Sequence, residues 1–211
     1  MLFSFNITLI TNTMVVDTLK KAIIVVGDDS TVTKIPGEIV YNSVSSMKAS
    51  IYDLAKDKAM PFRKAVMGTI SRKKDKTVVI CLGRNDIINY RGIAIDGVFK
   101  NYAKVAVEIL TKFIREMRVS NRDCNRKFVI ASVLPSIVGR GTDQYDVTQL
   151  KHSIILNKAL RNMCKKESIE FIDTWLSVFI DGKADGRIVS DSKKIGVGIM
   201  KGIFMALENN N

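Results

Sequence analysis

Short apolar runs alternate with amphipathic segments along most of the chain. The runs at 22–26 and 77–82 are nearly continuous and rich in β-branched residues, which is typical of parallel strands buried on both faces. Between 98 and 118, apolar residues at Val98, Tyr102, Val105, Ile109, Phe113 and Met117 recur every three or four positions and predict a long amphipathic helix. The same patterns predict strands at 38–41, 128–133 and 169–172, and helices at 45–58, 60–70, 149–166 and 193–208.

This alternation predicts an α/β fold, a three-layer α/β/α sandwich around a central parallel sheet with right-handed crossovers. The chain has 211 residues, of which 46% are hydrophobic, so it suits one domain with a full core. We expect residues 21–211 to form that domain. Residues 1–20 read as an N-terminal extension, an extra strand or an interface arm that could join copies into a homo-oligomer. Polar residues interrupt this apolar extension, which argues against a membrane span. A weak, uncleaved membrane anchor is the less favoured alternative.

The charge balance points to polyanions. Lysine and arginine number 33 against 21 acidic residues, a net charge of +12 that favours nucleic acid or an acidic protein as partner. Two basic loops, at 71–76 and 121–127, precede strands and should lie at the edge of the sheet opposite to the ligand-binding edge. Their candidate polyanion-binding residues are Arg72, Lys73, Lys74, Lys76, Arg122, Arg126 and Lys127. The alternative is a charge spread evenly over the surface.

Three separated cysteines without a CxxC pair support neither a zinc site nor a thioredoxin-type motif. Free thiols indicate a reducing compartment, so we expect an intracellular protein, cytoplasmic or nuclear. Cys81 lies inside an apolar run, which argues against thiol catalysis. We expect no cofactor.

Four segments, in order, resemble the sequence blocks of the SGNH (GDSL-type) hydrolases. These are AIIVVGDDST, the stretch 38–54, VVICLGRNDI, and LNKALRNMCKKESIEFID followed by ADGRIVSDSKKIGVGIM. The resemblance covers about 22–207 and implies the fold of that family.

The resemblance also implies roles for single residues. In the family, a first-block serine is the nucleophile, and a second-block glycine and a third-block asparagine donate to the oxyanion. Aligned without a gap, Asp29 occupies the nucleophile position; with one inserted residue, Ser30 does. Asn85 stands at the oxyanion asparagine, whereas Ser46 stands near the second-block glycine, with Asn42 upstream.

The last block lacks its base. Asp185 matches the family aspartate, but Ile188 stands where the family has histidine. The one histidine, His152, lies well before this block, and we expect it at a surface or against a loop. A serine hydroxyl is a poor nucleophile until a base takes its proton.

We therefore predict a catalytically inactive SGNH-like domain that serves as a binding or scaffold module for nucleic acid or a protein partner. Related domains occur in some viruses and mobile elements, which the resemblance offers as a setting. The alternative is an active serine esterase or acetylhydrolase with Ser30 as nucleophile and His152 or a carboxylate as base.

Two further hypotheses concern charged residues at the strand ends. The carboxylates of Asp28, Asp29, Asp86 and Asp185 could gather around a divalent cation, although holding loops through backbone amides is the favoured interpretation. Arg84 could pair with Asp29 and fill the former pocket.

Overall fold

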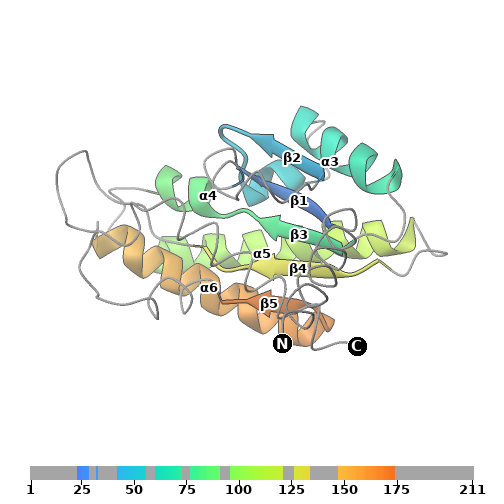
Figure 1. Ribbon diagram of the computed structural model, residues 1–211. Helices are drawn as coiled ribbons and strands as arrows, with labels where there is room; N and C mark the ends of the chain where they lie inside the picture. Colours follow the sequence, from blue (N-terminus) through green and yellow to red (C-terminus); the bar gives the residue numbers. More distant parts are fainter. Residues whose placement is uncertain are drawn as a thin grey trace, which may run out of the picture.

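The structure is a computed structural model that describes residues 23–28, 32, 42–55, 60–72, 77–90, 96–120, 126–133 and 147–173. One sheet of five parallel strands runs in the order β2-β1-β3-β4-β5, and helices connect its strands (Figure 1). The strands are β1 (Ile23–Asp28), β2 (Asn42–Ser46), β3 (Thr77–Cys81), β4 (Phe128–Ala131) and β5 (Glu170–Ile172). The helices are the 3-10 turn η1 (Ile51–Leu54), α3 (Pro61–Arg72), α4 (Arg84–Asn89), α5 (Asp96–Val119) and α6 (Val147–Glu167).

The central strands are apolar because they are buried on both faces. All six residues of β1 and all four of β4 are buried, and β1 pairs in parallel with β2 on one side and β3 on the other. This strand order and direction confirm the three-layer α/β/α sandwich predicted from the alternation of patterns.

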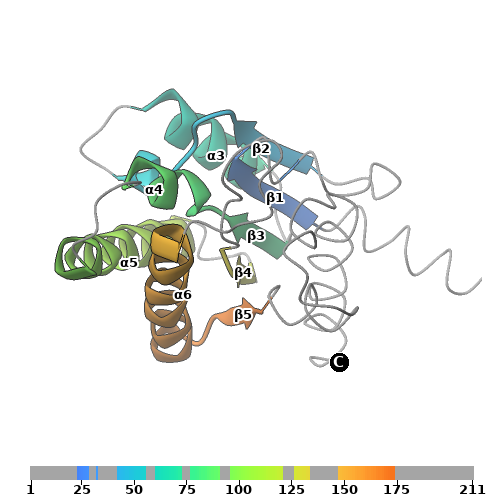
Figure 2. The same ribbon diagram turned by 90° about the vertical axis from the view of Figure 1, so that its left-hand side faces the viewer.

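Helices α5 and α6 lie side by side on one face of the sheet (Figure 2). The predicted helix at 98–118 is confirmed, but its buried face differs from the predicted one. Phe99, Ala103 and Ala106 are buried, while Val98 and Val105 are 43% and 45% exposed. The helix is turned in this way because its core-facing side packs against both the sheet and α6, so two valines remain in solvent.

The predicted helix at 45–58 is wrong. Asn42–Ser46 forms strand β2, a turn follows, and only Ile51–Leu54 is helical, as the 3-10 turn η1. Pairing with β1 favours the extended conformation, in which Val44 packs on the core and its neighbours face outward. Ile51 and Leu54 are buried as the pattern requires, whereas Met47 is 76% exposed.

Several predictions fall on residues that the structure does not describe. These are the extension at 1–20, the strand at 38–41 and the helix at 193–208. No helix in the described part of the chain combines the length and apolarity that a membrane span needs.

Candidate functional site

The carboxyl ends of β1, β2 and β3 bring three of the resembling blocks together. Asp28 at the end of β1 stands opposite Ser46 at the end of β2, and Gly27 stands opposite Cys81 of β3. The first, second and third blocks therefore meet at one edge, where ligands bind in open parallel sheets.

A glycine turn joins β3 to the third block. Gly83 has φ of 125°, a conformation that side chains rarely adopt, and its carbonyl accepts a hydrogen bond from the Ile87 amide at 3.1 Å. A Cβ at this position would lie 2.5 Å from Cγ2 of Val133. Only glycine fits here, so the turn aims the start of α4 toward the sheet edge.

Asn85, the counterpart of the oxyanion asparagine, points at the second block. Its Nδ2 donates to the carbonyl of Ala49 at 2.9 Å. Ala49 belongs to the turn that starts at Ser46, since its amide donates to the Ser46 carbonyl at 3.1 Å. Ser46 and Asn85 thus flank one turn, and one amide hydrogen of Asn85 is used to hold that turn.

Asp86 fixes the same turn from its other end. Its side chain is 1% exposed and accepts hydrogen bonds from the Ile51 amide, at 3.0 Å to Oδ2, and from the Tyr102 hydroxyl. Burial raises the pKa of Asp86 above its ordinary 3.8, and the hydrogen bonds from Tyr102 and Ile51 oppose that rise. Asp86 therefore holds a loop through a backbone amide, as the favoured interpretation had it.

No group of three His, Cys, Asp or Glu side chains that could hold a metal ion occurs among the described residues. Of the four carboxylates considered for a cation, the structure describes Asp28 and Asp86, both 1% exposed. Asp29 and Asp185 lie outside the described residues. The hypothesis that Arg84 pairs with Asp29 therefore stays a prediction.

Ser30 and Ile188 also lie outside the described residues. The structure therefore places the oxyanion counterparts Ser46 and Asn85, whereas the choice between Asp29 and Ser30 as nucleophile stays a prediction. The same holds for the replacement of the base by Ile188.

His152 is a core residue, so its expected position at a surface or loop was wrong. It lies in α6 with no exposed surface, and its ring stacks on Phe99 of α5 at 4.0 Å between centroids and 12° between planes. The cause is tertiary packing, because α6 turns this face toward α5. Phe99 in turn contacts Tyr90 and Tyr102, which extends the aromatic cluster toward Asp86.

The sequence did not indicate that Asn157 and Tyr102 hold loops through side-chain hydrogen bonds. Asn157 of α6 accepts from the Val133 amide at 2.7 Å and donates to the Val133 carbonyl at 2.8 Å, so it closes the end of β4 as a neighbouring strand would. Tyr102, which bonds Asp86, was assigned only an apolar role. A polar asparagine within a helical segment was the one indication of such a role. The sequence could not name its partner, because Val133 lies 24 residues away.

Of the two predicted basic loops, the structure describes Ser71, Arg72, Arg126 and Lys127. Arg126 is 8% exposed and donates from Nη2 to the Ile70 carbonyl of α3 at 2.8 Å, so it is a buried residue and not part of a solvent-facing basic surface. Lys127 pairs with Glu170 at 3.2 Å, and exposed Arg72 donates to the Gly68 carbonyl of its own helix. Lys73, Lys74, Lys76 and Arg122 lie outside the described residues.

Cys81 borders the site from the core. It is 7% exposed, and burial, with a smaller contribution from the charge of Asp28, raises the pKa of its thiol to about 12. Cys164 is 1% exposed, and burial raises its pKa to about 12 as well. At pH 8 both thiols are therefore almost entirely protonated.

We predict that neither thiol reacts with iodoacetamide at pH 8 in the native protein. The measurement is the mass shift of a Cys124→Ala variant, which retains Cys81 and Cys164, with and without denaturant. We expect no adduct in the native state and two on unfolding. Rapid labelling of Cys81 in the native protein would contradict its buried position and would make a reactive thiol at this edge of the sheet a candidate again.

Comparisons with known proteins bear on the fold. No protein-family model matches the sequence, and no curated protein matches it significantly. Among solved structures, a GDSL-like lipase from Bacteroides thetaiotaomicron is similar at 16% identity over 91% of this chain and 90% of that one, with a TM-score of 0.53. A protein described as a GDSL-like lipase from Parabacteroides merdae matches at 13% identity over 85% and 94%, with a TM-score of 0.60.

A catalytic variant of an acetylxylan esterase from Geobacillus stearothermophilus matches at 12% identity over 86% of this chain and 93% of that one, with a TM-score of 0.50. Each similarity spans nearly the whole of both chains at low identity. The block resemblance is thus confirmed by shape: this chain has the fold of the SGNH (GDSL-type) hydrolases.

Proposed function

We propose that this chain is a catalytically inactive SGNH-fold domain that serves as a binding or scaffold module. The observation that carries the proposal is the position of His152. It is the one histidine of the sequence, and it is fully buried against Phe99. A general base must reach the hydroxyl that it deprotonates, directly or through one water.

A second copy of the chain would not supply the base. Every copy has the same single histidine, in the same stacked position inside its own α5 and α6. A carboxylate base is also disfavoured in the described part of the site. Asp86 is committed to Ile51 and Tyr102, and Asp28 is 1% exposed.

The oxyanion side supports the same conclusion. The family position of the glycine donor is near Ser46, and one N–H of Asn85 is committed to the Ala49 carbonyl. Fixed donors aimed at the oxyanion contribute much of the acceleration in acyl transfer. Because one of the two Asn85 amide hydrogens holds the Ala49 turn, one hydrogen of this side chain is left for an oxyanion, which favours a low rate of acyl transfer.

The experiment compares hydrolysis of a short-chain nitrophenyl ester by wild type, Ser30→Ala and a control, Ser45→Ala, which changes an exposed serine of β2. We expect all three to turn over the ester at the same background rate. We also expect no covalent adduct at Ser30 after treatment with a fluorophosphonate.

An active esterase would give the opposite result. Removing the nucleophile of a serine triad costs about a million-fold in the best-studied case. Turnover that disappears in Ser30→Ala and persists in Ser45→Ala would therefore establish the alternative, a serine esterase with an unusual base.

The binding role draws on the net charge of +12. Such a surface attracts acidic partners and raises their local concentration. A retained fold with a basic surface suits recruitment of a partner more than turnover of a small ester.

A further inference from the structure

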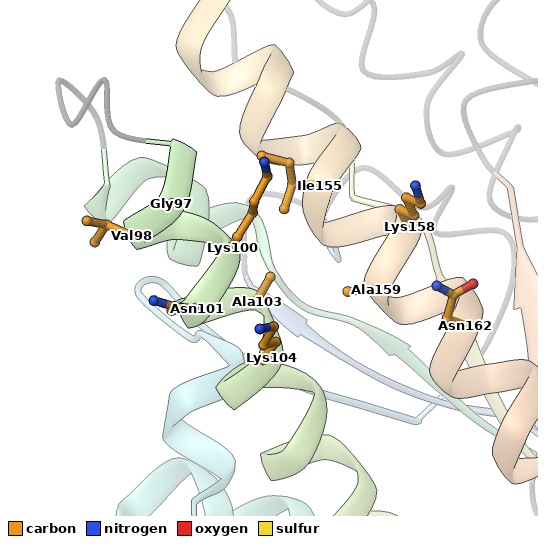
Figure 3. A pocket seen from close by; sticks show the side chains of 10 residues that line it. All are labelled: Gly97, Val98, Lys100, Asn101, Ala103, Lys104, Ile155, Lys158, Ala159 and Asn162. Atoms are coloured by element: carbon orange, nitrogen blue, oxygen red, sulfur yellow. The ribbon is translucent and has the colours of Figure 1, made fainter.

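A groove of about 590 Å³ runs between α5 and α6 on the outer surface of the domain (Figure 3). We call it the α5–α6 groove. Ala103 of α5 and Ile155 and Ala159 of α6 form its floor. Because two of these side chains are alanines, the floor is apolar and lies near the helix backbones, so the backbone of an occupant could approach closely.

Lysines surround this floor. Lys100 and Lys104 lie one turn apart on α5, and Lys158 lies across from them on α6. All three are exposed, and no acidic side chain lines the groove. Within the described residues, the ion pairs involve other side chains, and none of these lysines takes part in one. The groove therefore combines an apolar floor with unneutralised positive charge on both walls.

Asparagines complete the walls. Asn101 and Asn162 are exposed side chains at the same groove, one on each helix, and they can donate and accept hydrogen bonds. Val98, 43% exposed, extends the apolar surface toward the start of α5.

We propose that the α5–α6 groove binds an acidic amphipathic helix of a protein partner. The apolar face of that helix would cover the floor, and its flanking carboxylates would meet Lys100, Lys104 and Lys158. Helices dock into apolar grooves through residues spaced three and four apart, and opposite charges across the rim fix their direction. The inference deepens the proposed function, since it names the partner of the binding module.

Nucleic acid fits this groove less well. The groove has no arginine and no aromatic side chain, so neither bidentate contacts nor base stacking is provided. A phosphate backbone would meet the lysines but leave the apolar floor in water, and burial of that floor is the main energy available.

The probe is a display library of helical peptides of about 14 residues, roughly four turns, in which apolar and charged positions vary independently. We expect selection on the full chain to enrich glutamate or aspartate beside leucine, isoleucine or methionine at helical spacing. The enriched peptide, labelled for fluorescence anisotropy, is then titrated with the variants.

Charge reversal tests the walls. Lys104→Glu and Lys158→Glu together are expected to weaken peptide binding about tenfold or more, because attraction at two exposed sites becomes repulsion. The matched controls are Lys112→Glu on α5 and Lys165→Glu on α6, which change the same charge at exposed positions away from the groove. They are expected to change affinity less than threefold together.

Gly97→Trp obstructs the end of the groove at the start of α5 and leaves its charges unchanged. A Cβ at Gly97 would meet no atom within 4 Å, so a bulky side chain can be added at this lining position without a clash at its Cβ. We expect this variant to lose peptide binding at least tenfold while its melting temperature is not lowered. A diffuse electrostatic surface would not respond to Gly97→Trp.

Several outcomes would overturn the proposal. The selection could yield no binder, or binders that are not enriched in glutamate or aspartate. The control variants could weaken binding as much as the groove variants do. A DNA oligonucleotide could bind and lose affinity in Gly97→Trp as the peptide does. A dimer of the chain that Gly97→Trp dissociates would assign the groove to a second copy instead. The ester assay is independent of all these measurements, so an active enzyme and a misassigned groove would be told apart.

Discussion

Replacing Gly83 by alanine is expected to lower the free energy of unfolding by about 3 kcal/mol or more. The residue has φ of 125°, and its new Cβ would lie 2.5 Å from Val133 Cγ2 and 3.1 Å from Leu156 Cδ2. Backbone strain and overpacking thus act at one position. The measurement is denaturant unfolding of wild type and variant.

Gly68 provides the matched control. It lies within α3, and a Cβ there would meet only the Arg72 guanidinium, at 3.8 Å. Gly68→Ala should raise stability by roughly 0.5–1 kcal/mol, because alanine is the better helix former. Equal stability losses in both variants would show that Gly83 is not specially constrained, and the turn into the third block would need another explanation.

The second large effect is expected for Asp86→Ala, with a loss of about 2–5 kcal/mol. The variant removes the carboxylate that accepts hydrogen bonds from the Ile51 amide and the Tyr102 hydroxyl, and it leaves both donors unsatisfied. A buried polar group without a partner costs about 1–3 kcal/mol. Asp86→Asn keeps one acceptor oxygen and a similar volume, so its loss should be clearly smaller.

The pH dependence separates the charge of Asp86 from its hydrogen bonds. Since burial raises its folded pKa above 3.8, the native state holds the proton more tightly than the unfolded chain does. Its contribution is full below pH 3.8 and is lost as pH rises through the folded pKa. The stability of Asp86→Asn relative to wild type should therefore increase as pH rises from 3.8, as measured by unfolding at several pH values. A constant difference would contradict the raised pKa.

Most helices and strands could be predicted from the sequence, because the spacing of hydrophobic residues shows which positions of a segment are buried. Strand β1 and helix α6 lie close to the segments predicted for them, at 22–26 and 149–166. The carboxyl-edge position of Ser46 and Asn85 was also predictable. Parallel strands place their ends on one side, and the blocks occur at those ends.

Other features depend on the tertiary structure, because neither the hydrophobic periodicity nor a sequence motif determines them. Pairing with β1 made 42–46 a strand in spite of a helical spacing at Met47, Ile51 and Leu54. Long-range packing of α6 on α5 placed His152 on Phe99, and these residues are 53 positions apart. The sequence by itself indicated a parallel α/β sandwich and showed that the chain has a single histidine. Whether that imidazole is available, and which lysines share a groove, depends on contacts between distant segments.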